Sequence, residues 1–200
     1  FDTSLNYVFT LNKLNQNFQP SSGFSSSFYQ SVPLYADDWS LNNEFRYSKY
    51  YSPNDTAIIS FKFLAESINS LSGDDVRISK RVYLPSKRMR GFESGKIGPV
   101  DQGDYVGGNY ASALNIATTL PGLLSDLENV DFSLFFDAGN VWGVDYSDTI
   151  SSSSKIRSST GLGIDWLTPI GPLSFSFTKA ISKADSDKTE TFRFDLGTTF

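Results

Sequence analysis

The residues of this chain best suited to making a specific contact form the short segment Arg90-Gly91-Phe92. Arginine carries five N–H donors in a rigid fork that fits a carboxylate, and glycine allows a sharp turn of the backbone. The phenylalanine beside them supplies a large apolar anchor. These residue types permit a docking contact, which needs no covalent step, but a lone Arg-Gly-Phe segment does not predict one.

Covalent and metal chemistry have few residues to draw on, because the 200-residue sequence contains neither histidine nor cysteine. A Ser-His-Asp site, a thiol nucleophile and the usual zinc site are therefore excluded. The segment 91–96 has the glycines, serine and lysine of a nucleophile elbow or a phosphate loop, but its spacing fits neither motif. A Ser-Lys or paired-carboxylate mechanism is the enzymatic alternative left open. We expect a protein that is not an enzyme, with no cofactor and no metal.

Composition favours a β-rich protein that faces both oil and water, and a soluble all-β domain is the alternative. No apolar run reaches the roughly 18 residues of a membrane-spanning helix. The 17 Phe and 10 Tyr are nevertheless many for a chain with a mean hydropathy of -0.25, as is typical of lipid-facing strands and interfacial girdles. A net charge of -5 argues against nucleic acid as a partner, since phosphate binding needs a basic face.

The segment 190–200 alternates apolar and polar residues, which predicts a strand with one oily and one wet face. In an outer-membrane barrel the oily face contacts lipid and the wet face lines the lumen. An edge strand of a soluble sandwich would alternate in the same way and is the alternative. The two faces are Phe192, Phe194, Leu196 and Phe200 against Thr191, Arg193, Asp195 and Thr199.

Turn chemistry divides the chain into nine strand-like segments. Only the connector at about 68–106 is far longer than the usual 4 to 6 or so residues, which is typical of a functional loop. Outer-membrane barrels have short periplasmic turns, so the turn at 168–172 and the last residue are assigned to the periplasmic side and the long connector to the outer side. The expected strands are 3–12, 24–34, 39–51, 56–67, 109–119, 130–142, 156–168, 172–181 and 190–200.

Nine strands would close only through a parallel seam, which single-chain bacterial barrels avoid by having even strand counts. We therefore expect one domain, 1–200, that forms part of a larger antiparallel transmembrane β-barrel. The first residues already alternate like a strand and do not look like a signal peptide. The chain is expected to be either a mature protein cut at this point or a fragment of a longer one.

Five motifs occur in register along the chain and resemble the C-terminal half of the BamA-type outer-membrane assembly barrel, the bacterial surface antigen family. The resemblance covers nearly the whole chain and implies a sixteen-strand barrel, of which residues 1–200 would supply the last nine strands. The motifs are Arg88-Met89-Arg90-Gly91-Phe92-Glu93-Ser94, Ile97-Gly98-Pro99, Val106-Gly107-Gly108-Asn109, Phe135-Phe136-Asp137-Ala138-Gly139-Asn140-Val141-Trp142 and the segment Gly161 to Leu173.

In that family a long outer loop folds back into the lumen and its Arg-Gly-Phe tip docks on the barrel wall. The resemblance thus implies that Arg90-Gly91-Phe92 docks, with Asp137 as its carboxylate partner. Strand parity permits this, because the apolar residues at 132, 134 and 136 would face lipid and Asp137 the lumen. A solvated carboxylate with no partner is the alternative. A water-accessible pair would contribute on the order of 1 kcal/mol.

Two departures from the family pattern concern this loop. The neighbouring strand has Asn115 where a second acidic residue is usual, so Arg90 would have one full counter-charge and the loop would be held more loosely. The glycine pair that often precedes the tip is replaced by the segment 84–88, which alters the backbone path by which the loop enters the lumen.

The last strand resembles the family's seam strand, in which Gly197 would allow a kink and Phe200 would end the chain. A glycine that only relieves crowding is the alternative for Gly197. In the family this strand pairs loosely with the first one, so the seam opens toward lipid. An incoming strand then adds to the free edge.

The resemblance implies a function in outer-membrane protein assembly, by templated strand addition at that seam. The implied partners are the outer-membrane lipid bilayer, unfolded outer-membrane proteins as substrates, accessory lipoproteins, and periplasmic domains of the full-length protein. The expected location is the bacterial outer membrane. Two alternatives remain, a polypeptide-exporting or TamA-like barrel of the same superfamily and a passive pore.

Overall fold

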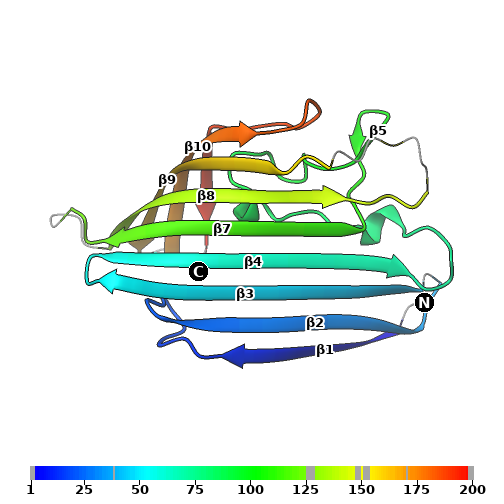
Figure 1. The fold of residues 1–200 in the computed structure, drawn as a ribbon, viewed down its shortest axis with the longest axis horizontal. Coiled ribbons are helices and arrows are strands. Elements are labelled where there is room, and N and C mark those ends of the chain that lie inside the picture. The colour runs from blue at the N-terminus through cyan, green and yellow to red at the C-terminus, as the bar shows by residue number, and fades with distance from the viewer. Residues whose placement is uncertain are drawn as a thin grey trace.

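The computed structural model describes residues 3–37, 39–124, 129–146, 150, 154–169 and 171–197. They form one antiparallel nine-stranded sheet in which each strand pairs with the strands before and after it (Figure 1). The sheet curves, so that its last strands turn behind β7 and β8 (Figure 1). Its strands are β1 (Thr3–Asn12), β2 (Gly23–Tyr35), β3 (Ser40–Asn54), β4 (Ala57–Ser70), β7 (Tyr110–Pro121), β8 (Val130–Trp142), β9 (Arg157–Thr168), β10 (Gly171–Ser182) and β11 (Phe192–Leu196).

The antiparallel all-β fold and the order of the nine strands are confirmed, and the boundaries of most strands differ from the expected ones by one to three residues. The largest difference is at β11, which is expected over 190–200 and runs only from Phe192 to Leu196. Gly197 ends it with φ +117, a backbone conformation that L side chains rarely adopt. Phe200 lies outside the described residues. β1 and β11 are the two edges of the sheet, and no pairing joins them within the described ranges.

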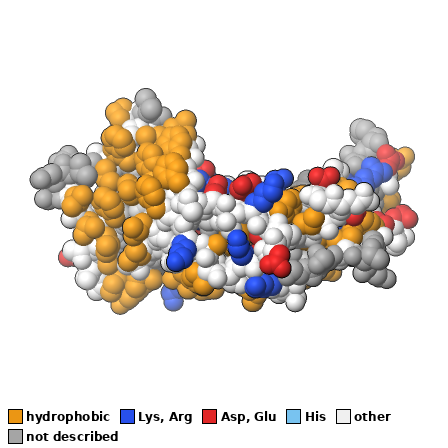
Figure 2. All heavy atoms as spheres, turned by 90° about the horizontal axis from the view of Figure 1, so that it is seen from above, with side chains coloured by type: hydrophobic (Ala, Val, Ile, Leu, Met, Phe, Trp, Pro, Cys, Tyr) orange, Lys and Arg blue, Asp and Glu red, His pale blue; other side chains and the backbone are white. Residues whose placement is uncertain are grey.

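The two faces of the sheet have opposite character. Leu134, Leu162 and Phe177 on the outer face expose half or more of their surface, whereas Leu64 and Asp137 on the inner face are fully buried. Figure 2 shows hydrophobic side chains gathered in a broad patch over one end of the molecule, with acidic and basic side chains along the hollowed middle. An apolar outer face is the pattern of a membrane barrel, and the inner face here combines polar side chains with an apolar core under the connector.

The buried core lies between the inner face of the sheet and the long connector from residue 71 to residue 109. Expected to be irregular, this connector contains the short 3-10 helices η1 (Ile78–Lys80) and η2 (Ser86–Arg88) and a small hairpin of β5 (Val100–Asp101) and β6 (Asp104–Tyr105). The residues that form the core are Leu64, Ile68, Val76, Val82, Leu84, Met89, Phe92, Ile97, Ala111, Ala113 and Val141. Residues of the connector thus fill the concave side of the sheet.

Within the described residues, no helix has the length and apolar character needed to span a membrane.

The assignment of the outer face to lipid can be tested at Leu162, which lies in the middle of β9 and is 55% exposed. Leu162→Arg in the full-length protein should lower the free energy of unfolding by about 2–4 kcal/mol, because the cation would face hydrocarbon. Urea unfolding in lipid vesicles measures the change. Leu162→Met keeps this surface apolar and is the control. Equal stabilities of the two variants would contradict the assignment of this face to lipid.

Candidate functional site

The site is built on one row of inward-facing residues that crosses neighbouring strands. Strand register pairs Lys62 of β4 with Asn115 of β7, Asn115 with Asp137 of β8, and Asp137 with Ser159 of β9. Because side chains alternate between the faces of a sheet, these residues share the inner face. The tip of the long connector, residues 88–92, lies across this row.

Arg90 contacts Asp137 through a two-pronged ion pair. Its Nε and a terminal guanidinium nitrogen each donate to a different carboxylate oxygen at 2.7 Å, and its backbone N–H donates to the same carboxylate at 3.2 Å. The guanidinium carbon also lies 3.5 Å from the centroid of the Phe135 ring, which adds a cation–π contact. The side chain of Asp137 is 0% exposed and that of Arg90 22%.

Burial changes the expected energy of this pair. The figure of about 1 kcal/mol applies to pairs in open water. Here, removing the arginine would leave a buried carboxylate without its counter-charge, which costs on the order of 3–5 kcal/mol. Loss of the Arg90 side chain is therefore expected to disturb the position of the loop.

Gly91 lets the tip approach the sheet closely. Its φ is +89, and a Cβ at this position would lie 3.1 Å from the Ser159 Cβ and 3.3 Å from the Thr178 Cβ. The hydroxyl of Ser159, a residue of β9, donates to the carbonyl of Arg90, so the tip contacts this strand directly. Phe92 follows with 1% exposure and belongs to the core between connector and sheet.

Asn115 contacts the loop through Arg88, and within the described part of the chain it has no hydrogen bond to Arg90. Its amide donates to the Arg88 carbonyl at 3.0 Å and to Asp137 at 2.8 Å, and its carbonyl accepts from the Arg88 guanidinium at 3.2 Å. Among the described residues, Asp137 is the one carboxylate in an ion pair with Arg90. Sequence reasoning did not assign a contact to Arg88, although the residue lies in the same motif.

A second set of contacts, not expected from the sequence, holds the base of the connector. Arg81 is buried and donates to the Val76 carbonyl and, at 3.0 Å, to Asp145. Burial alone would raise the pKa of Asp145, but hydrogen bonds from Asn109 and the Val76 N–H, with the nearby Arg81 charge, lower it below its ordinary value. Asp145 is therefore a stable anion at neutral pH.

A third set joins the connector to the segment between β10 and β11, residues 183–191. The Glu190 N–H donates to the Gly91 carbonyl at 3.1 Å, and the Glu93 N–H donates to the Lys188 carbonyl at 3.0 Å. Arg193 of β11 donates to the Phe92 carbonyl at 3.3 Å. The docked tip thus touches the segment that leads into the last strand.

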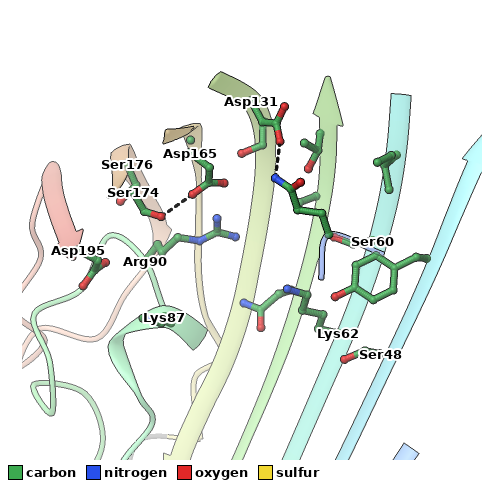
Figure 3. A pocket seen from close by; sticks show the side chains of 18 of the residues that line it. Ser48, Ser60, Lys62, Lys87, Arg90, Asp131, Asp165, Ser174, Ser176 and Asp195 are labelled. Atoms are coloured by element: carbon green, nitrogen blue, oxygen red, sulfur yellow. Dashed lines mark hydrogen bonds between the residues drawn. The ribbon is translucent and has the colours of Figure 1, made fainter. Parts of the chain in front are cut away.

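A cavity of about 460 Å³ lies beside the docked tip, on the inner face of the sheet. Figure 3 shows Arg90 from the loop and Lys62 from β4 projecting toward it, with Asp131 and Asp165 from β8 and β9 at its wall. Gln19, in the connector between β1 and β2, donates to Asp131 at 3.2 Å. The described residues contain no group of three or more His, Cys, Asp or Glu that could hold a metal ion. The lining is suited to polar contacts and to water.

Of the seam residues expected from the sequence, Gly197 follows β11 directly and donates its N–H to the Pro172 carbonyl at 3.0 Å. A Cβ there would meet no atom within 4 Å, so its positive φ, and not crowding, favours glycine at this position.

A curved antiparallel sheet, apolar outside and plugged inside by its own connector, defines an outer-membrane β-barrel. All 200 residues match the model of the Omp85 superfamily domain, so the chain belongs to the Omp85 superfamily and lies in the outer membrane as part of such a barrel. This confirms the family resemblance seen in the sequence.

Several known proteins align over much of the chain. It is 29% identical over 203 residues to the outer membrane protein assembly factor BamA of Neorickettsia risticii, covering 99% of this chain and 27% of that protein. It is 34% identical over 140 residues to BamA of Neisseria meningitidis, covering 56% and 17%. A SAM50-like protein of Schizosaccharomyces pombe is 29% identical over 160 residues, covering 74% and 33%. The chain therefore spans about a quarter or less of the two BamA relatives.

A solved structure shares the fold. The crystal structure of BamA from Haemophilus ducreyi lacking POTRA domains 1-3 superimposes with a TM-score of 0.84 at 26% identity, covering 96% of this chain and 41% of that one. The likeness therefore extends over nearly all of the sheet and its connectors.

The close approach of Gly91 to the sheet can be tested by adding a methyl group there. Gly91→Ala should speed hydrogen exchange of the Glu190 amide roughly tenfold, equivalent to about 1.4 kcal/mol, because the new methyl group would push the tip away from Ser159 and Thr178. Gly95→Ala is the matched control: its φ is also positive, but the nearest atom to its Cβ is 3.8 Å away. Equal exchange in the two variants would show that the wall contact does not hold the tip.

Proposed function

We propose that this chain is part of a protein that inserts and folds β-barrel proteins in the outer membrane. The observation that carries the proposal is the docking of Arg90-Gly91-Phe92 on Asp137, inside a sheet of the Omp85 superfamily. Two of the aligned relatives are named as outer membrane protein assembly factors. Because the chain covers only part of their length, the activity of the whole protein is inferred.

The docked connector would serve as a brace inside the lumen. It fills the concave side of the sheet with a buried core and fixes its tip through a buried ion pair. A passive pore needs an open lumen, so this filling favours assembly over a pore. The polypeptide-exporting, TamA-like alternative would share such a brace, and the names of the relatives favour assembly.

The last strand would supply the working edge. β11 has five residues and pairs with β10, and in the described part of the chain its other edge has no partner strand. Where the full-length barrel opens at this edge, β11 would present unpaired N–H and C=O groups, which an incoming strand can bind by β-augmentation. Insertion would proceed by exchange of backbone hydrogen bonds along this edge, with no covalent bond made or broken. Gly197 would let the strand bend away at its periplasmic end.

The proposed partners follow from this mechanism. Unfolded outer-membrane proteins would be the substrates, since they carry the strands that the edge can bind. The lipid bilayer would receive them, because the outer face of the sheet is apolar. Accessory lipoproteins and periplasmic domains of the full-length protein would deliver the substrates.

The ion pair provides the direct test of the docked brace. Arg90→Ala in the full-length protein should lower the yield of a folded β-barrel reporter severalfold, because Asp137 would be left buried without its counter-charge. Arg90→Asp combined with Asp137→Arg should recover part of the loss. Arg77→Ala, at an exposed arginine of the same connector, is the control. A reporter yield unchanged by Arg90→Ala would remove the docking role.

The seam requires a separate experiment. A disulfide between β11 and the first strand of the full-length barrel should block assembly until it is reduced, since the edge could no longer open. The 200 residues contain no cysteine that would compete for pairing. The readout is growth of cells that depend on the cross-linked protein, with each single-cysteine variant as control. Normal growth under oxidising conditions would argue against lateral opening.

A further inference from the structure

A second buried ion pair lies away from the predicted docking residues. Arg157, the first residue of β9, donates from Nε to Asp187 at 2.9 Å and from a terminal nitrogen to the other carboxylate oxygen at 3.0 Å. Both side chains are 0% exposed. Asp187 lies in the segment between β10 and β11, which also supplies the backbone partners of the docked tip.

We propose that the Arg157–Asp187 pair is a positioning contact that holds segment 183–191 where its backbone captures the docked tip, and so couples the loop to the last strand. The inference deepens the proposed function and rests on it. It adds a link between the brace inside the lumen and the edge that would receive substrate.

The hydrogen bonds around Asp187 fix the shape of the segment. The Asp187 carboxylate accepts from the Ala184 N–H, and the Asp187 N–H donates to the Ala184 carbonyl at 3.1 Å, which closes a tight turn. The Ser186 carbonyl within that turn accepts from the Tyr105 hydroxyl of the long connector. Arg157 therefore anchors a turn that already touches the connector.

The residues after the turn form a short ladder with the tip. The Lys188 N–H donates to the Lys96 carbonyl at 3.3 Å, the Glu93 N–H to the Lys188 carbonyl at 3.0 Å, and the Glu190 N–H to the Gly91 carbonyl at 3.1 Å. Phe92 and Thr189 form an isolated antiparallel bridge at the same place. These bonds need residues 188–190 at a fixed distance from the tip, and that position depends on the turn anchored by Asp187.

Arg157 also joins the anchor to β8. One terminal nitrogen donates to the Asn140 side-chain oxygen and to the Lys155 carbonyl. Asn140 lies three residues after Asp137, so the two buried ion pairs are attached to the same strand. The tip is thus held by β8 directly through Asp137 and indirectly through Asn140, Arg157 and Asp187.

Because the Arg157–Asp187 pair is buried and charged, a single substitution in it should have a large effect. A buried carboxylate or guanidinium that loses its partner is costly, and the surrounding chain moves to let water reach it. Movement of the turn would break the ladder at residues 188–190 before it disturbed β7 and β8, because those strands have their own complete pairing.

The test is hydrogen exchange on the full-length protein in lipid nanodiscs, combined with the reporter assembly assay. Asp187→Asn, which keeps the shape and removes the charge, should speed exchange of the Glu93, Lys188 and Glu190 amides at least tenfold. The amides that pair β7 with β8 should keep their rates. Asp185→Asn removes the same charge from an exposed position of the same segment and is the matched control. Arg157→Asp combined with Asp187→Arg should restore slow exchange in part.

Unchanged exchange at the three amides in Asp187→Asn would overturn the inference, whatever the assembly yield. A uniform rise across the whole sheet, not reversed in the double variant, would also overturn it, because it would show a role in general stability. Faster exchange confined to the ladder, with assembly reduced, supports the inference and the proposed function together. Faster exchange in the ladder with assembly intact supports the positioning role and counts against the function proposed for the docked tip.

Discussion

The contact between Arg90 and the fully buried carboxylate of Asp137 is the interaction on which the arrangement of the lumen depends. A buried carboxylate is costly unless charge and hydrogen bonds compensate it, and here it accepts three bonds from Arg90 and one from Asn115. Arg90 can supply this charge and these bonds only when the tip of the connector contacts β8. The wall and the loop are therefore each incomplete without the other, which explains how a segment of about forty residues keeps one position.

A second constraint comes from the two solvents that the sheet faces. Its outer face carries exposed Leu and Phe side chains, so the apolar residues that a soluble domain would bury are directed to lipid. The buried core is moved to the inside, where Leu64 and Ile68 of β4 pack against Val82, Leu84 and Met89 of the long connector. The connector therefore forms part of the buried core together with the sheet.

The docked loop is held in three places, each of a different kind. Its base is held by Arg81 and Asp145, its tip by Arg90 and Asp137, and the far side of the tip by backbone bonds to residues 188–190. The third place connects to β11 through only a few residues, and Arg193 of β11 itself reaches the Phe92 carbonyl. A movement of β11 would therefore act directly on the docked tip of the connector.

The sequence alone determined the strands and the side of the sheet on which Asp137 lies, because alternation along a strand is a local property fixed by backbone geometry. It did not determine the partners of Asn115, Arg81 and Arg157. Asn115 bonds to Arg88, 27 residues away, Arg81 pairs with Asp145 across 64 residues, and Arg157 with Asp187 across 30. Each of these pairings links a loop to a strand or to another loop, and no periodic pattern fixes how a loop folds. Only the tertiary structure decided them, because the loops find their positions by burying charge and apolar surface together on a curved sheet.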